Sequence, residues 1–182
     1  DAVMRYFDGT LDGGADAAMN KIILLLRLPR VLLAIIAGAG LALAGALMQS
    51  VTRNYLVSPF TLGISSAAAL GASLCIVLAA GTALDSDLGI ITSAFLLSCA
   101  CGLIVYGIAQ RSGLSPTTIV LVGIALNYFF SALTATLEFF AQEHKLAAVI
   151  QWTFGSLHRA SWEYVAIGGV IVTLGLAAAL FY

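Results

Sequence analysis

Long uncharged and mostly apolar stretches follow one another along the chain, separated by short polar segments. Five of them have 19 or more residues and cover 31–52, 54–84, 88–110, 112–137 and 164–182. A helix needs about 20 predominantly apolar residues to cross the hydrocarbon core of a bilayer. The pattern therefore predicts an all-α integral membrane protein, a transmembrane bundle with about five spanning helices.

Turn residues between the stretches set the expected limits of these helices. Pro29 is expected in the first turn of a helix, where its missing N–H costs nothing, and Pro59 disfavours helix at the residue before it. Residues 142–161 are amphipathic and too polar to span, so we predict a short interfacial or re-entrant helix there. We expect a single transmembrane domain over 1–182, with a loop over 1–28 and spans over about 29–50, 62–80, 88–109, 117–141 and 162–182.

The composition is that of a membrane protein. The chain is 61% hydrophobic and 9% charged, whereas soluble domains have about 25% charged residues. A net charge of −1 without a basic run gives no indication of nucleic-acid binding. Cys75, Cys99 and Cys101 all lie in apolar stretches. We favour packing as small hydrophobes for these thiols over a metal or redox pair.

The charges near the predicted turns leave the orientation open. One side of the predicted bundle carries only Arg53 and Arg111, and the other carries six Lys and Arg residues. An excess of Lys and Arg in short loops marks the cytoplasmic side, which would place the N-terminal side there. Yet the chain starts at Asp1 and stops at Tyr182 inside an apolar stretch. We therefore expect a piece of a longer polypeptide, for which the charge count does not decide and five spans are a lower bound.

Small residues recur every four positions on one face of the first predicted span. This ridge consists of Ala34, Gly38, Ala42 and Ala46. Small side chains let the backbones of neighbouring helices approach closely in lipid. We expect this face to pack tightly within a helical bundle.

The fourth predicted span carries a stripe of polar residues. It consists, at spacings of four, three and four, of Asn127, Ser131, Thr134 and Glu138. These spacings place the four side chains on one helical face. A polar stripe inside a spanning helix should face protein or water rather than lipid. It either lines a pathway through the membrane or is hydrogen-bonded against a neighbouring helix, and the sequence favours neither.

No catalytic arrangement is indicated. Residues 63–67 superficially resemble the sequence around a hydrolase nucleophile, but that motif needs a strand before its turn. No P-loop glycine motif for nucleotide phosphates occurs, so ATP hydrolysis would take place on another chain. His144 and His158 could serve haem or metal. We favour solvated surface histidines, because no further ligand lies close in sequence.

A series of short motifs follows in a fixed order along nearly the whole chain. They are Arg27-Leu28-Pro29-Arg30, Gly45-Ala46-Leu47-Met48-Gln49, Asn54-Tyr55-Leu56-Val57-Ser58-Pro59, Leu62-Gly63-Ile64-Ser65-Ser66, Leu114-Ser115, Leu121-Val122-Gly123-Ile124-Ala125-Leu126-Asn127 and Trp152-Thr153-Phe154-Gly155-Ser156. This ordered set resembles the permease subunits of the ABC importers for ferric siderophores, haem and vitamin B12. Two positions depart from the family pattern: Tyr55 stands where proline is frequent, and Ala67 where glycine is usual.

The resemblance implies a type II ABC importer permease of the bacterial cytoplasmic (inner) membrane. Such permeases have about ten spanning helices, of which this chain is similar to the second to sixth. Residues 1–28 and 142–161 would then be outside, and 51–60 and 111–117 cytoplasmic. The implied cargo is an iron complex, foremost a ferric siderophore, with haem or cobalamin as alternatives and an ion-coupled secondary transporter as a further one.

The resemblance also implies the partners of the chain. They are a second permease subunit (identical or paralogous), cytoplasmic ABC ATPase subunits, an extracytoplasmic substrate-binding protein and membrane lipid. No cofactor, metal site or nucleic acid is implied. Arginines of the first motif, here Arg27 and Arg30, would dock glutamates of the binding protein. Arginine forms bidentate contacts with carboxylates, although the pair could instead reach lipid phosphates.

Two segments of the resemblance concern the cytoplasmic gate of the translocation pathway. They are Asn54 and Leu56 in the first cytoplasmic connection, and Ser115, Pro116 and Thr117 at the start of the fourth span. Ordinary turn chemistry is the alternative explanation, because Asn, Ser and Pro are common turn residues. The polar stripe on the fourth span, Asn127 to Glu138, would line the pathway beyond the gate.

Overall fold

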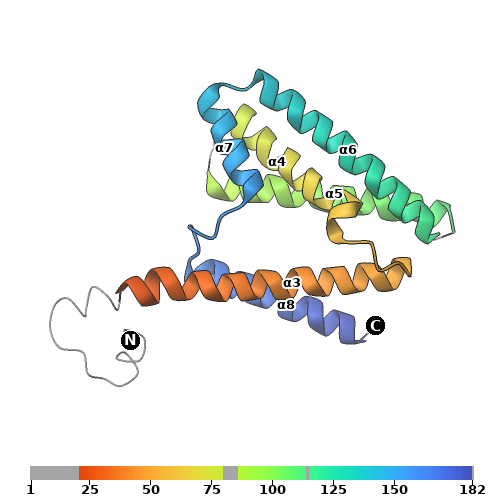
Figure 1. The fold of residues 1–182 in the computed structure, drawn as a ribbon, viewed down its shortest axis with the longest axis horizontal. Coiled ribbons are helices and arrows are strands. Elements are labelled where there is room, and N and C mark those ends of the chain that lie inside the picture. The colour runs from red at the N-terminus through yellow and green to blue at the C-terminus, as the bar shows by residue number, and fades with distance from the viewer. Residues whose placement is uncertain (1–20, 80–85, 114, 182) are drawn as a thin grey trace. The chain divides into compact units, whose positions relative to one another are not determined.

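A computed structural model describes residues 21–79, 86–113 and 115–181. The regular elements of these residues are all helical (Figure 1). In chain order they are η1 (Ile23–Arg27), α3 (Leu28–Thr52), η2 (Pro59–Leu62), α4 (Ile64–Leu78), α5 (Asp87–Arg111), α6 (Pro116–Phe140), α7 (Glu143–Phe154) and α8 (Trp162–Phe181). Four helices are long and apolar enough to cross a membrane, namely Ile23–Thr52, α5, α6 and α8. The prediction of an all-α membrane protein is confirmed.

The second predicted span, 62–80, differs from the structure. Its α-helical part, α4, has 15 residues. At 1.5 Å per residue α4 is about 22 Å long, shorter than the roughly 30 Å of a hydrocarbon core. The residues before it form the 3₁₀ turn η2, which Gly63 ends with a positive φ of 76°. Residues 80–85 and residues 1–20 of the predicted loop over 1–28 lie outside the described residues. Residues 21–28 of that loop are helical, so the prediction of a loop is wrong there.

The start of the first span also differs from the prediction, because Pro29 lies inside a helix rather than in its first turn. Helical residues begin at Lys21, and the π-helical turn η1 leads without a break into α3. In η1 the N–H of Leu28 donates to the carbonyl of Ile23, five residues back. A proline inside an α-helix clashes with the carbonyl four residues before it. The wider π turn gives the ring of Pro29 room.

One compact unit of the chain contains Asp1–Leu43 and Ser156–Tyr182. Within its described residues the first part of α3 packs against α8, and the two helices run in the same direction. A β-carbon on Gly168 would lie 3.3 Å from Cγ2 of Ile36, and one on Gly40 would lie 3.0 Å from Cγ2 of Val172. The glycines therefore let the two backbones come close, as small residues do between membrane helices.

The small-residue ridge of α3 is not the face that packs on α8. Ala34, Gly38, Ala42 and Ala46 are all exposed in the structure, and a β-carbon on Gly38 would meet nothing within 4 Å. The prediction that this ridge packs tightly is wrong within the described residues. The face that contacts α8 instead mixes branched apolar side chains with glycine, so a repeat of small residues does not mark it.

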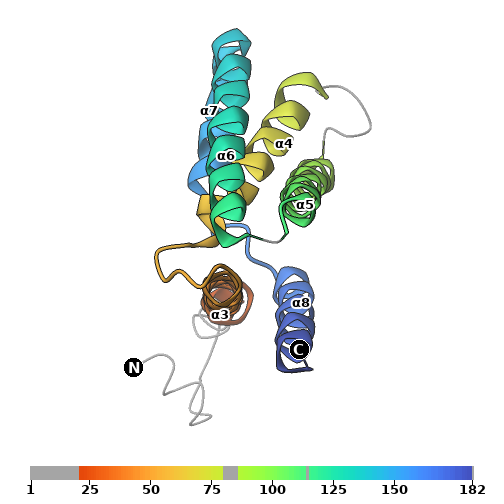
Figure 2. The ribbon, with the colours of Figure 1, turned by 90° about the vertical axis from the view of Figure 1, so that its right-hand side faces the viewer.

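The second compact unit, Ala44–Gly155, has α4 in its middle. Helix α4 contacts α5, α6 and α7 (Figure 2). It lies antiparallel to α5: the hydroxyl of Ser93 donates to the carbonyl of Gly71 (2.8 Å), and that of Ser98 donates to the carbonyl of Ile64 (3.3 Å). The buried core of this unit consists of Leu62, Ala67, Leu70, Cys101, Val105, Ala109, Ile119 and Phe130.

Helix α7 is held against the end of α4 by a lysine. The ammonium group of Lys145 donates a 2.7 Å hydrogen bond to the carbonyl of Val77 in the last turn of α4. The last carbonyls of a helix lack intrahelical partners and carry partial negative charge, so a cation there is favourable. Of the predicted amphipathic segment 142–161, residues 143–154 are helical.

Candidate functional site

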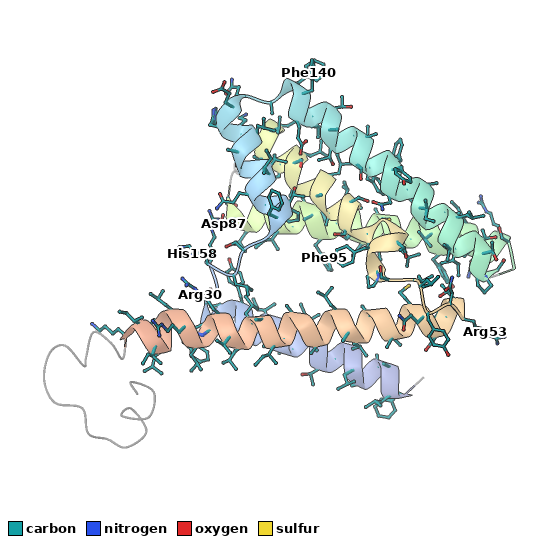
Figure 3. The ribbon with its side chains drawn as sticks, viewed as in Figure 1. Arg30, Arg53, Asp87, Phe95, Phe140 and His158 are labelled. Atoms are coloured by element: carbon teal, nitrogen blue, oxygen red, sulfur yellow. The ribbon has the colours of Figure 1, made fainter. Side chains whose placement is uncertain are left out.

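The two arginines predicted to dock the binding protein lie at the N-terminal end of the first long helix. Arg27 ends the π turn and is exposed, whereas Arg30 is half-buried. One terminal nitrogen of Arg30, Nη2, lies 3.1 Å from Nδ1 of His158 and donates to the backbone carbonyl of the same residue at 3.4 Å. Figure 3 shows the two side chains beside each other. Arginine cannot accept a hydrogen bond, so Nδ1 of His158 is the acceptor in this contact.

His158 is thus more than a solvated surface histidine. It is exposed, as predicted, but its ring and its carbonyl both bind Arg30, 128 residues away in sequence. The Nε atom of Arg30 is buried and has no hydrogen-bond partner among the described residues. The guanidinium is therefore fixed on one side by His158 and packed against protein along its stem.

Trp162 makes a second contact between the start of α8 and this end of α3. Its indole N–H donates a 3.1 Å hydrogen bond to the carbonyl of Leu24. In π-helical register the partner of that carbonyl would be the N–H of residue 29, and Pro29 has none. Trp162 therefore supplies the donor that the proline lacks.

The first predicted gate segment is an exposed turn between two buried anchors. Thr52 and Val57 are each 3% exposed, whereas Tyr55 and Leu56 are 89% and 88% exposed. The N–H of Val57 donates to the carbonyl of Asn54 (3.3 Å), which closes a four-residue turn. Residues 53–56 are therefore exposed, whereas the buried residues Thr52 and Val57 hold the two ends of the turn in the second unit.

Side chains hold the backbone of this turn. The Oδ1 atom of Asn54 accepts a 2.9 Å hydrogen bond from the N–H of Leu56, and Nε2 of Gln49 donates to the carbonyl of Tyr55 (3.0 Å). The turn chemistry weighed as the alternative role of Asn54 is therefore present. These hydrogen bonds use only the backbone of Leu56, so its side chain projects from the turn and is exposed. A cavity of about 400 Å³ lies beside the turn and is lined by Ala46, Gln49, Ser50, Arg53 and Tyr55.

Arg53 ends α3 in a backbone conformation that favours glycine. Its φ is 48°, and it is the one non-glycine residue with positive φ among those that the structure describes. The N–H of Arg53 donates to the carbonyl of Ser50 and that of Asn54 to the carbonyl of Gln49, the pattern of a Schellman cap whose left-handed position is usually glycine. The left-handed region costs a residue with a β-carbon about 1 kcal/mol or more.

We expect Arg53→Gly to raise the free energy of unfolding of the permease by about 1 kcal/mol, because glycine adopts this φ without strain. Thermal unfolding in detergent measures the change. Arg53→Ala keeps a β-carbon and should give no gain. Arg111→Gly removes the same charge from the last helical residue of α5 and should lower stability by about 0.5 kcal/mol. A loss of stability in Arg53→Gly would contradict this account of the cap.

The second predicted gate segment begins α6. Ser115 is the N-cap residue, with φ −61° and ψ 123°, and Pro116 is the first helical residue, a position where proline needs no N–H partner. Thr117, in the same first turn, is exposed. The segment is thus a regular helix start whose hydroxyl-bearing residues are at least partly accessible.

The polar stripe of α6 is divided between two environments. Thr134 is buried, and its hydroxyl donates to the carbonyl of Phe130 (3.0 Å). Ser131 is exposed, while Asn127 and Glu138 are half-buried. The hydroxyl of Thr134 bonds within its own helix, so lining of a pathway and packing against a neighbouring helix both stay predictions for the stripe. Ser131 lies on the exposed surface of α6.

The motifs 62–66 and 121–127, far apart in sequence, contact each other at Gly63 and Gly123. A β-carbon on Gly63 would lie 2.9 Å from the backbone nitrogen of Asn127, and one on Gly123 would lie 2.7 Å from Cα of Leu62. Residues 62–66 and 121–127 thus pack backbone against backbone. This pairing cannot be predicted from the sequence, because a close approach of two backbones leaves only glycine as a signal.

The remaining candidate ligands are dispersed. Among residues 21–79, 86–113 and 115–181, no group of three or more His, Cys, Asp or Glu residues is placed to hold a metal ion. His144 and Cys99 are exposed, whereas Cys75 and Cys101 are buried. The thiol of Cys101 points to the carbonyl of Leu62 at 3.5 Å, so this cysteine takes part in packing between α5 and the turn before α4.

The arrangement of helices and motifs agrees with the comparison with known families. The model of the FecCD transport family matches residues 3–182. This chain belongs to the FecCD transport family. It is accordingly a multi-pass protein of the cytoplasmic membrane, and FecCD proteins are transport permeases rather than catalytic enzymes.

Individual FecCD relatives show the extent of the similarity. An iron chelatin transport system permease protein of Helicobacter pylori is 37% identical over 159 residues, which are 87% of this chain and 47% of the relative. A molybdate import system permease protein of Haemophilus influenzae is 35% identical over 153 residues, 81% of this chain and 43% of the relative. The chain thus spans about half the length of the curated relatives it matches.

A solved structure shares the fold. An ABC transporter of the metal-chelate type in an inward-facing conformation has a TM-score of 0.77 and 33% sequence identity, with 89% of this chain and 50% of that chain covered. The helix order found here is therefore that of a FecCD permease.

Proposed function

We propose that this FecCD chain belongs to the permease subunit of an ATP-driven importer that moves a metal chelate across the cytoplasmic membrane. The family match over residues 3–182 carries this proposal. The long apolar helices support a translocation role, because their charged residues lie at helix ends and loops rather than at mid-span. An ion-coupled transporter would instead need charged or polar ion sites near the midplane.

The cargo that we propose is a ferric siderophore. A relative is named for an iron chelatin, and the α6 stripe offers hydroxyl and amide groups without a cluster of acids that would strip Fe³⁺ from its chelator. Haem and cobalamin importers would share these features. A molybdate permease is also similar to the chain, so an oxyanion is the second candidate.

Three kinds of partner follow from the proposal. ATP would be hydrolysed by separate cytoplasmic ATPase subunits, and a second permease subunit would complete the pathway. An extracytoplasmic substrate-binding protein would dock on Arg27 and Arg30. The exposed turn at Asn54 and Leu56 and the segment Ser115–Thr117 would form the cytoplasmic gate, and Asn127, Ser131, Thr134 and Glu138 would line the pathway.

Uptake by the assembled importer in proteoliposomes tests the cargo. We expect ATP-dependent accumulation of a ferric hydroxamate or ferric catecholate that saturates with the loaded binding protein. Haem, cyanocobalamin and molybdate should accumulate at least about tenfold less. Accumulation of molybdate alone would overturn the siderophore assignment but leave the importer intact. Uptake that follows an ion gradient without ATP would overturn the importer itself.

A further inference from the structure

We propose that His158 is a positioning residue that holds Arg30 in the orientation needed to dock the substrate-binding protein. This inference rests on the docking role proposed above for Arg27 and Arg30. It adds a residue from the α7–α8 connection, which no motif of the sequence assigned to docking.

The first support is the geometry of the contact. A single nitrogen of Arg30, Nη2, is directed to both the ring Nδ1 (3.1 Å) and the backbone carbonyl (3.4 Å) of His158. A free arginine side chain samples many rotamers, and its side-chain entropy amounts to about 2 kcal/mol. Holding the guanidinium before the partner arrives removes part of that cost from the docking step.

The second support is that the segment carrying His158 is itself ordered by local hydrogen bonds. The N–H of His158 donates to the hydroxyl of Ser156 (3.0 Å), and the N–H of Ala160 donates to the carbonyl of Leu157 (3.1 Å). Ser161 then accepts from the N–H of Tyr164 in the first turn of α8. A histidine on such a turn has a defined place from which to hold another side chain.

The third support is the nearby contact between Trp162 and Leu24. Leu24 lies three residues before Arg27, and Arg30 lies three residues after it. The two hydrogen bonds, Trp162 to Leu24 and Arg30 to His158, therefore bracket the exposed Arg27, with Pro29 fully buried between them. The arginine pair sits on a stretch of helix that is fixed at both ends to the start of α8 and the turn before it.

The arrangement gives the two arginines different parts in docking. Arg27 is exposed, which suits it to make the first electrostatic contact. Arg30 is half-buried and already held, which suits a carboxylate that must be met in one geometry. To hold Arg30, the side chain at position 158 needs only a hydrogen-bond acceptor where Nδ1 lies. The Oδ1 atom of asparagine occupies a similar place, so we expect asparagine to substitute for His158.

The experiment measures docking of the cognate binding protein, loaded with a ferric hydroxamate, to the complete importer in lipid nanodiscs. ATPase activity is recorded against the concentration of binding protein for His158→Ala and His158→Asn. His144→Ala is the matched control, because His144 is an exposed histidine of the same predicted outer segment. Both alanine changes are repeated in an Arg30→Ala background, and thermal unfolding is measured for every variant.

We expect His158→Ala to raise the half-saturating concentration of binding protein about three- to tenfold, as for loss of one typical hydrogen bond, with the rate at saturation unchanged. His158→Asn and His144→Ala should stay within about twofold of the unchanged protein. In the Arg30→Ala background, His158→Ala should have no further effect.

The outcomes separate the inference from the function on which it rests. If Arg27 and Arg30 variants weaken docking while His158→Ala does not, the positioning role is refuted and the docking role stands. If His158→Asn is as weak as His158→Ala, or if His158→Ala still weakens docking without Arg30, the effect is structural and the inference fails. If Arg27 and Arg30 variants dock normally, the proposed docking function fails first.

Discussion

Replacing Gly123 by alanine is expected to destabilise the permease by about 2 kcal/mol, although alanine is the better helix former. The new β-carbon would lie 2.7 Å from Cα of Leu62 and 2.8 Å from the carbonyl oxygen of Thr61. Both are backbone atoms, so the turn before α4 must move away from α6. Overpacking of this kind costs about 1–3 kcal/mol. Thermal unfolding of the purified permease in detergent measures the loss.

Gly102 and Gly107 of α5 are the matched controls for this prediction. A β-carbon on either would meet nothing within 4 Å. Alanine at these positions should be neutral or stabilising by up to about 1 kcal/mol, the usual difference between glycine and alanine inside a helix. If Gly123→Ala proved as stable as Gly107→Ala, the backbone contact between α6 and the 62–66 motif would be refuted.

Reversing the charge of both docking arginines should abolish import. We expect Arg27→Glu with Arg30→Glu to weaken docking of the substrate-binding protein at least about 30-fold, because like charges would then face each other across the interface. Arg30→Glu would also lose the hydrogen bond to the backbone carbonyl of His158, since a carboxylate has no donor. Binding of the protein to the importer in nanodiscs, together with ATP-dependent uptake, measures the effect.

Lys21→Glu is the matched control for the charge reversal. Lys21 is an exposed cation at the same end of the same helix, so its reversal changes the local field but not the arginine pair. It should weaken docking less than about fivefold. Replacing the facing glutamates of the binding protein by lysine should restore affinity to the doubly reversed permease. If docking of the doubly reversed permease remained normal, the arginines would be assigned to lipid phosphates instead.

The long helices could be predicted closely from the sequence. The expected spans 88–109, 117–141 and 162–182 correspond to α5, α6 and α8, which cover 87–111, 116–140 and 162–181. Charged and turn-forming residues stand at both ends of the first two and at the start of the third. Where a polar boundary coincides with a helix end, hydrophobic length alone locates the helix.

Two features were missed where the apolar pattern is continuous. Residues 54–84 form one uncharged stretch, yet the helix within it is short, because the left-handed Gly63 separates a 3₁₀ turn from α4. Pro29 was predicted to lie in the first turn of a helix. In the structure a π turn precedes it, and it lies inside a longer helix. Both depend on backbone geometry that hydropathy does not record.

The candidate site was foreseen in part. The arginine motif named Arg27 and Arg30, but nothing local pointed to His158, whose contact with Arg30 joins residues 128 positions apart. The same holds for Trp162 and Leu24. The roles of the gate and stripe residues remain proposals.

Side-specific labelling tests the central claim most directly, because the account needs the two ends of the helix Ile23–Thr52 on opposite faces of the membrane. Arg27→Cys and Arg53→Cys are made separately in a Cys99→Ala background and treated with a membrane-impermeant maleimide in right-side-out vesicles. We expect labelling of Arg27→Cys in sealed vesicles and of Arg53→Cys only after the vesicles are opened. Labelling of Arg53→Cys from outside, with Arg27→Cys protected until opening, would contradict the account.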